Sequence, residues 1–183
     1  MTIKLYCFGE SGNAYKAALA LELSGLDWEL VKVDFFGGET RTAEYRQNIN
    51  EMGEVPVMID GDVKLTQSGV IQDYISSKTG KLGGQSADER RGVLRWMFFD
   101  NHKVSGVAGP LRFNMNFLPE DKRNTDVNGF LLMRLISALK VLNTHLEGRD
   151  WIVGDAPTNA DLTCCGYLFY PETFGFDRAD WPN

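Results

Sequence analysis

Residues that build metal sites, disulfide frameworks and membrane spans are scarce in this sequence. Its 183 residues include three cysteines and two histidines, and none of these has the spacing typical of metal ligands. Three cysteines, two of them adjacent, do not make a disulfide framework and favour a reducing compartment. No apolar stretch is long enough to span a bilayer, and no basic leader precedes a hydrophobic segment at the N-terminus. We therefore expect a cytoplasmic protein without a membrane partner.

Clusters of basic residues are also missing. The formal net charge is −6, and lysines and arginines never form runs longer than a pair. This balance argues against nucleic acid and anionic membranes as partners. The hydrophobic content of 43% is ordinary for a globular protein, and the length suffices for one domain or two small ones. A small molecule is therefore the expected class of ligand.

The first half of the chain alternates strands and helices in the order β-α-β-α-β-β-α. This order is typical of a thioredoxin-like α/β domain. Residues 11–14 read Ser-Gly-Asn-Ala where a dithiol enzyme has Cys-x-x-Cys, which excludes a dithiol mechanism. The expected strands are 3–8, 28–33, 55–59 and 63–65, and the expected helices are 13–24, a weak one within 35–50, and 66–78.

The second half shows helical patterns and no strand. A glycine-rich polar segment separates the halves, so we expect an α/β domain over 1–78, a linker over 79–86 and an all-α domain over 87–183. The helices are expected over 88–117, with a bend at 106–110, over 120–147, and from Thr158, which has capping-box spacing with Asp161.

The Val55-Pro56 step and the Gln67-Ser68 pair predict a binding surface for a small peptide. A proline at the start of a strand cannot donate to the sheet, and we expect its peptide bond to be cis. The backbone of Val55 would then point away from the sheet and pair with an extended ligand. At the helix that opens with Thr66, Gln67 and Ser68, the Ser68 hydroxyl and backbone N–H groups would hold a carboxylate. The alternative interpretation is a plain helix start, for which Thr66 suffices as the N-cap.

Four segments, in this order, resemble the soluble glutathione S-transferase family over nearly the whole chain, in its bacterial form with a serine-type active site. They are Ser11–Asn13, Gly53–Pro56, Leu65–Ser68 and Thr158–Asp161. The resemblance implies that glutathione is bound by Val55, Pro56, Gln67 and Ser68, that a small hydrophobic electrophile is the second substrate, and that no cofactor is needed. It also implies a homodimer. Members of the family usually continue with a further helix, so we expect the helical domain to be incomplete at its C-terminus.

The resemblance places Ser11 where the family has its thiol-activating residue. A hydroxyl donor at a helix N-terminus stabilises a thiolate, although serine at this position is also a common N-cap. Asn13 offers an amide as a second donor, or acts as a turn residue. Some classes of the family use a tyrosine at the end of the first strand, which makes Tyr6 the rival. Strand alternation places Tyr6 on the face opposite to Cys7, which we expect to be buried.

Three functions stay open at this point. They are a glutathione transferase active in detoxification, a glutathione-dependent reductase of disulfides or peroxides, and a non-catalytic glutathione-binding or interaction protein. Phe98 and Asn101 lie on the helix that usually flanks the active cleft in the family, and they are candidates for lining a second-substrate pocket.

Overall fold

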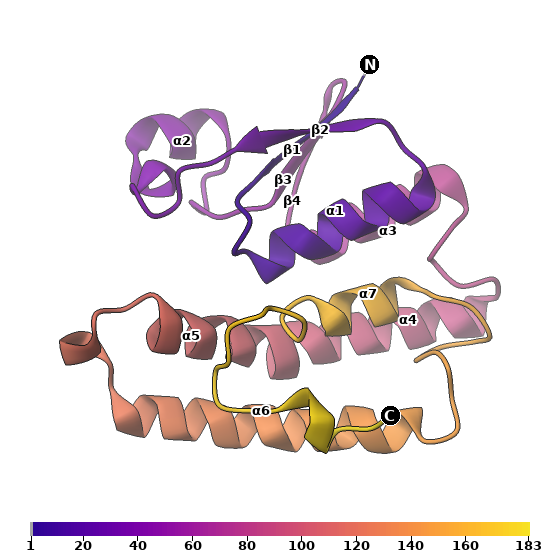
Figure 1. Cartoon of the computed structure of the whole chain (residues 1–183). Coiled ribbons are helices and arrows are strands. Elements are labelled where there is room, and N and C mark those ends of the chain that lie inside the picture. The colour runs from indigo at the N-terminus through magenta and orange to yellow at the C-terminus, as the bar shows by residue number, and fades with distance from the viewer. Residues whose placement is uncertain (1) are drawn as a thin grey trace. The chain divides into compact units, whose positions relative to one another are not determined.

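The structure is a computed structural model that describes residues 2–183 (Figure 1). The chain divides into two compact units, and the second begins at Gly84. The first unit is α/β and the second is helical, which confirms the predicted fold class. The finer division into residues 1–78, a linker over 79–86 and residues 87–183 stays a prediction. Within residues 2–183, no helix combines the length and the hydropathy needed to cross a membrane.

A four-stranded sheet with the order β2-β1-β3-β4 forms the centre of the first unit. The central strand β1 pairs in parallel with β2 and antiparallel with β3, and β3 pairs antiparallel with β4. A parallel pair needs a crossover connection, which helix α1 supplies here. The strands are β1 (Ile3–Cys7), β2 (Trp28–Lys32), β3 (Val57–Asp60) and β4 (Val63–Thr66).

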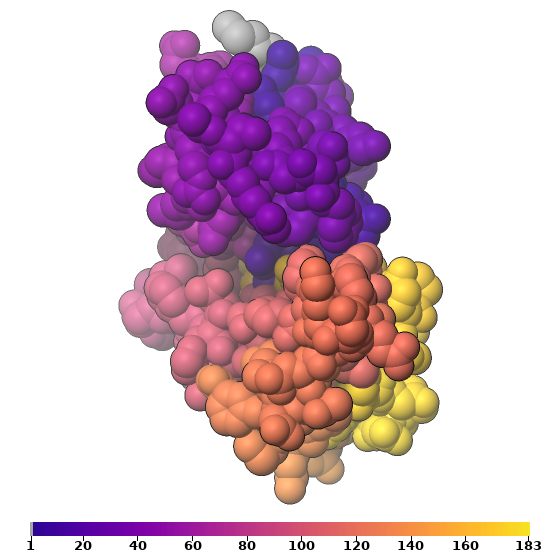
Figure 2. All heavy atoms as spheres, turned by 90° about the vertical axis from the view of Figure 1, so that its left-hand side faces the viewer, coloured from indigo at the N-terminus to yellow at the C-terminus, as the bar shows by residue number. Residues whose placement is uncertain are grey.

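Helices α1 and α3 lie side by side on one face of this sheet, and α2 lies away from them (Figure 1). Helix α1 ends at Gly25, whose φ of 73° is the left-handed conformation expected of a C-cap glycine. The segment between β2 and β3, coloured purple, forms most of the face of the first unit seen in Figure 2. The helices of this unit are α1 (Gly12–Ser24), the short 3₁₀ turn η1 (Glu39–Arg41), α2 (Ala43–Asn48) and α3 (Ser68–Thr79).

The expected start of α3 at Thr66 is wrong, and so is the alternative in which Thr66 is a plain N-cap. Thr66 is the last residue of β4, where it pairs with Val57, so its backbone is extended and belongs to the sheet. The N-cap is Gln67, whose φ is 67° and whose side chain makes no capping hydrogen bond. A positive φ is uncommon for a residue other than glycine, and such positions cluster at ligand-binding sites.

The regular secondary structure of the second unit, residues 84–183, is helical. Its buried core lies between α5, α6 and the C-terminal segment, with residues such as Leu111, Leu135 and Phe174 at its centre. The elements are α4 (Ala87–Phe99), the π-helical turn η2 (Asp100–Val104), α5 (Ser105–Asn116), the 3₁₀ turn η3 (Glu120–Lys122), α6 (Thr125–Leu146), α7 (Asn159–Cys165) and the 3₁₀ turn η4 (Arg178–Asp180).

The long helix expected over 88–117 is interrupted earlier than predicted. The irregular turn lies at Asp100–Val104, and α5 continues through Pro110. The buried carboxylate of Asp100 accepts hydrogen bonds from the hydroxyls of Ser105 and Thr163, each at 2.7 Å. These bonds hold the π-helical turn against α7. Gly106 then passes so close to the turn that a Cβ would lie 2.4 Å from the carbonyl oxygen of Asn101.

The predicted capping box at the start of α7 is present. The backbone N–H of Thr158 donates to the Asp161 carboxylate at 2.7 Å, and the Thr158 hydroxyl oxygen accepts from the N–H of Ala160 at 3.2 Å. The second carboxylate oxygen of Asp161 accepts from the N–H of Ile152 at 2.8 Å. One side chain therefore ties the helix start to the preceding loop.

A polar contact joins the end of β3 to the last turns of α3. The Asp60 carboxylate accepts a hydrogen bond from the Tyr74 hydroxyl at 2.9 Å and forms an ion pair with Lys78. The hydrogen bond from Lys78, followed by that from Tyr74, lowers the pKa of Asp60 below its ordinary value, against an opposing effect of burial. The ionised carboxylate is thus favoured in the folded protein.

We predict that Asp60 stabilises the fold at neutral pH and that this contribution disappears in acid. The folded-state pKa is the lower one, so the contribution is complete above the unfolded pKa and is lost as the pH falls through the folded pKa. Tyr74→Phe should lower the free energy of unfolding at pH 7 by about 0.5–1.5 kcal/mol, the range for one hydrogen bond. Urea denaturation of the wild type and of Asp60→Asn should give curves that converge below about pH 4. Asp62→Asn, on the adjacent exposed turn, is the control, and a pH-independent effect of Asp60→Asn would contradict the prediction.

Candidate functional site

The Val55–Pro56 peptide bond is cis, as predicted. The residue before it is held from two directions, because the carbonyl oxygen of Glu54 accepts from the Tyr45 hydroxyl at 3.0 Å and from the Asn50 amide at 2.9 Å. The Asn50 side chain also accepts from the N–H of Met52 at 3.0 Å. The loop that leads into Val55 is therefore fixed by side chains of α2 and of the turn that follows it.

Tyr45 remains a hydrogen-bond donor over a wide pH range. Burial, followed by the nearby Glu39 carboxylate and by Tyr6, raises the pKa of Tyr45 to about 12. A phenol with that pKa keeps its proton at physiological pH. The bond to Glu54 thus does not depend on pH near neutrality.

The sheet register brings the start of α3 to this loop. Val57 at the start of β3 pairs with Thr66 at the end of β4, so the residues before Val57 lie beside those after Thr66. The Gln67 side-chain amide donates to the Glu54 carboxylate at 3.1 Å and lies 3.3 Å from the Met52 sulfur. The half-buried Ser68 is the first residue of α3, where backbone N–H groups and the helix dipole favour an anion.

Ser11 lies at the same end of the sheet. β1 ends there, because Tyr6 of β1 pairs with Val57, the first residue of β3. Ser11 is buried and is the N-cap of α1, and its hydroxyl oxygen accepts from the N–H of Ala14 at 3.2 Å. A hydroxyl that accepts in this way still has its own proton to donate. The capping role and the role of thiol donor are therefore compatible.

Asn13 and Tyr6 differ in their surroundings. The side-chain oxygen of Asn13 accepts from the buried ammonium group of Lys16 at 3.2 Å, which fixes the orientation of the amide. Tyr6 is half-buried and lies on the face of β1 opposite to Cys7, as predicted, and it acts electrostatically on Tyr45. Cys7 is buried, as predicted, and burial raises the pKa of its thiol. The roles assigned to Ser11, Asn13 and Tyr6 stay predictions.

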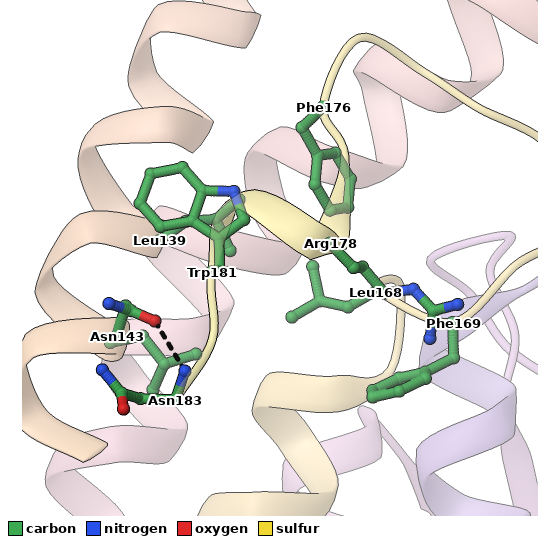
Figure 3. A pocket seen from close by; sticks show the side chains of 9 residues that line it. Leu139, Asn143, Leu168, Phe169, Phe176, Arg178, Trp181 and Asn183 are labelled. Carbon is green, nitrogen blue, oxygen red and sulfur yellow. Dashed lines mark hydrogen bonds between the residues drawn. The ribbon is translucent and has the colours of Figure 1, made fainter. Parts of the chain in front are cut away.

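Phe98 and Asn101 belong to the second unit. Phe98 is an exposed residue at the end of α4, and Asn101 lies in the π-helical turn. A pocket of about 240 Å³ occurs elsewhere in this unit, between α6, the end of α7 and the C-terminal segment (Figure 3). Neither residue lines it, and their role as second-substrate contacts stays a prediction. The pocket is lined by Leu139, Leu142, Asn143, Leu168, Phe169, Phe176, Arg178, Trp181 and Asn183.

The lining of this pocket is mostly apolar, and two of its polar side chains, Asn143 and Arg178, contact other residues of the lining. The backbone N–H of Asn183 donates to the Asn143 side chain at 3.0 Å, and the Arg178 guanidinium lies 4.7 Å from the centre of the Phe169 ring (Figure 3). No motif in the sequence marks these residues, because they come together only when the C-terminal segment packs on α6.

Three contacts of the candidate site could not be predicted from the sequence. The Gly53–Pro56 motif includes Glu54, but its contact with Gln67 spans thirteen residues and depends on the β3–β4 hairpin. Tyr45 and Asn50 lie in a segment whose pattern is only weakly helical. Their spacing does not indicate that both donate to the carbonyl oxygen of Glu54.

Comparisons with known proteins agree with this geometry. The family model for the N-terminal domain of glutathione S-transferase matches residues 1–77. The glutathione S-transferase-like protein LUC7 of Fusarium sp. is 30% identical over 182 residues, which cover 97% of this chain and 81% of the relative. Elongation factor 1-gamma 1 of rice, Oryza sativa subsp. japonica, is 31% identical over 173 residues, which cover 92% of this chain and 40% of the relative.

Solved structures give the same result. A glutathione S-transferase from Xanthobacter autotrophicus Py2 has a TM-score of 0.89 and 30% sequence identity, covering 99% of this chain and 88% of that one. A glutathione transferase from Burkholderia graminis, with two glutathione molecules bound per subunit, has a TM-score of 0.83 and 28% identity, covering 91% of this chain and 71% of that one.

The chain belongs to the soluble glutathione S-transferase family. It spans 40% of the length of the rice elongation factor and 65% of glutathione S-transferase F14 of Arabidopsis thaliana.

We predict that Gly53 is required for the geometry of the loop that leads into Val55. Its φ is 69°, and a Cβ there would lie 2.8 Å from the carbonyl oxygen of Thr40. Gly53→Ala should therefore lower the free energy of unfolding in urea by about 1–3 kcal/mol. Gly61→Ala is the matched control, because its φ is 60° and nothing lies within 4 Å of the added methyl group. Equal losses for the two variants would show that the close approach at Gly53 does not matter.

Proposed function

We propose that this protein binds glutathione in its first unit and stabilises the thiolate of glutathione for attack on a small hydrophobic electrophile. One observation carries the proposal: the end of β1, the cis peptide before β3 and the start of α3 meet at one end of the sheet. Membership in the glutathione S-transferase family supports the same conclusion.

Glutathione would be held as an extended peptide. Its cysteinyl backbone pairs with the backbone of Val55, in the manner of an added strand, and Pro56 shapes this surface. Its γ-glutamyl carboxylate lies at the start of α3, where it accepts from the Ser68 hydroxyl and backbone N–H groups. Gln67 contacts the polar groups at the same end of the ligand.

Ser11 would act on the sulfur. Its hydroxyl donates to the thiolate while its oxygen continues to cap α1, and the helix N-terminus adds a favourable potential. The Asn13 amide is a second donor. Because the ligand brings its own nucleophile, orientation and electrostatic support suffice, and the proposal requires neither a protein base nor a cofactor.

A second candidate is a glutathione-binding or interaction protein without turnover. The similarity to an elongation factor over 92% of this chain favours it, because the same fold then occurs in a protein with a different name and role. A reductase of disulfides or peroxides would use the same donors at Ser11 and Asn13. For each candidate we propose a cytoplasmic homodimer, the common arrangement for a protein of this family.

We predict that Ser68→Ala weakens glutathione binding. The variant loses a hydrogen bond to a carboxylate, which corresponds to about 1.5–3 kcal/mol, or roughly a 10- to 100-fold rise in Kd. Isothermal titration calorimetry measures the effect. Ser77→Ala, an exposed serine on the same helix, should leave Kd unchanged. Unaltered affinity of a folded Ser68→Ala variant would rule out this placement of the carboxylate.

We predict that Ser11→Ala raises the pKa of bound glutathione and that Tyr6→Phe does not. Loss of one donor to the thiolate should lower the rate near neutral pH by about 10- to 100-fold, as read from pH profiles at saturating glutathione. Ser11→Thr, which keeps both the cap and the hydroxyl, should restore most of the activity. A loss of activity in Tyr6→Phe with Ser11→Ala unaffected would assign activation to Tyr6.

The substrate used in this assay separates the candidates. A dinitrophenyl electrophile reports transferase activity, and hydroxyethyl disulfide or a peroxide reports reductase activity. Binding of glutathione without turnover of any of the three would replace the transferase by the non-catalytic candidate.

A further inference from the structure

Helix α1 carries a buried lysine in its second turn. Lys16 is 1% exposed, and lysine is among the residue types that are almost never fully buried without a partner. Its ammonium group donates to the side-chain oxygen of Asn13 at 3.2 Å. The two residues are three positions apart, so they are neighbours on one face of α1. The lysine side chain therefore reaches back to the first turn of the helix, where Ser11 is the N-cap.

This contact does not cap the helix. The capping acceptor is the Ser11 hydroxyl, which receives the N–H of Ala14. Asn13 instead uses its side-chain oxygen to accept from Lys16. A cation near a helix N-terminus is moreover unfavourable, because that end of the helix carries a partial positive charge. The contact therefore acts on the orientation of the Asn13 amide and not on the start of α1.

The Asn13 amide has two orientations, which differ by a half turn about its last side-chain bond and exchange its oxygen and nitrogen. An ammonium group has three donors and no acceptor, so the amide faces Lys16 with its oxygen. The amide nitrogen is left to donate elsewhere. Within residues 2–183 it has no hydrogen-bond partner. The half-buried Asn13 thus keeps an oriented donor available two residues after Ser11.

We propose that Lys16 is a positioning residue that fixes the Asn13 amide with its nitrogen toward the sulfur of bound glutathione. The inference rests on the proposed function and adds to it a residue that does not itself touch the ligand. Because Lys16 holds the amide oxygen, the donor is ordered before glutathione binds. A hydrogen bond accepted by the amide oxygen also polarises the amide N–H groups, which strengthens their bond to a thiolate.

The test measures the pKa of the thiol of bound glutathione, read from thiolate absorbance. Asn13→Ala removes the donor and should raise this pKa by about 1–2, the effect of one hydrogen bond to a charged group. Lys16→Met keeps the length of the side chain and removes its donors. It should raise the pKa by about 0.4–1, the cost of ordering one free amide side chain. The double variant should match Asn13→Ala, because Lys16 acts through Asn13.

A second variant serves if Lys16→Met does not fold. Lys16→Gln has an acceptor as well as donors, so it does not select one orientation of the Asn13 amide. It should therefore raise the thiol pKa in the same direction as Lys16→Met. Lys32→Met is the control, because it removes an exposed lysine from the end of β2, which pairs with the end of β1. The thiol pKa should be unchanged in this variant.

S-methylglutathione distinguishes positioning from a general loss of structure, since its sulfur cannot ionise. Its Kd, measured by calorimetry, should be the same in the wild type and in each folded Lys16 variant. An equal loss of affinity for both ligands would make the role of Lys16 structural and overturn the inference. An unchanged thiol pKa in the Lys16 variants, or additive shifts in the double variant, would overturn it as well. These results leave the proposed function standing, whereas no binding of millimolar glutathione by the wild type would overturn both.

Discussion

The carbonyl oxygen of Glu54 is the acceptor on which the candidate site depends. It receives two hydrogen bonds, from the phenol of Tyr45 and from the amide of Asn50, and these bonds tie α2 and the turn after it to the loop that leads into Val55. Each such bond contributes about 1 kcal/mol. This is a small part of the free energy of unfolding of a domain, but it is enough to restrict the conformations of a loop. The backbone of Val55 is placed by these bonds before any ligand arrives.

A second constraint is the direction of the strands. In an antiparallel pair, the start of one strand lies beside the end of the other, and β3 has such a relation to both β1 and β4. Three loops that are far apart in the sequence therefore meet at one end of the sheet, and two of them lead into helices. The helix N-termini add their partial positive charge at the same place. The net charge of the protein is −6, yet the helix N-termini favour an anionic group at this one end of the sheet.

Much of this arrangement could be predicted from the sequence, because it follows from local rules. Alternation assigned the faces of β1, the Val-Pro step indicated a cis bond, and the spacing of Thr158 and Asp161 gave the capping box. The positive φ of Gln67 could not be predicted, since glutamine has no preference for this conformation and the residue lies between the paired end of β4 and the start of α3. The position of the π-helical turn could not be predicted either, because Asp100 accepts a hydrogen bond from Thr163, which lies on a different helix. Burial and long-range contacts override local preference at these positions.

The burial of Cys7 determines how its thiol can react. Cys7 ends β1, just before the loop that carries Ser11. An exposed, reactive thiol at Cys7 would form mixed disulfides with a thiol ligand bound at the proposed site. Exchange with a disulfide requires the thiolate and an open path to the sulfur. Burial removes both, because it raises the pKa of Cys7 and closes the approach from solvent. The fold thereby withholds the Cys7 sulfur from exchange with disulfides in solution.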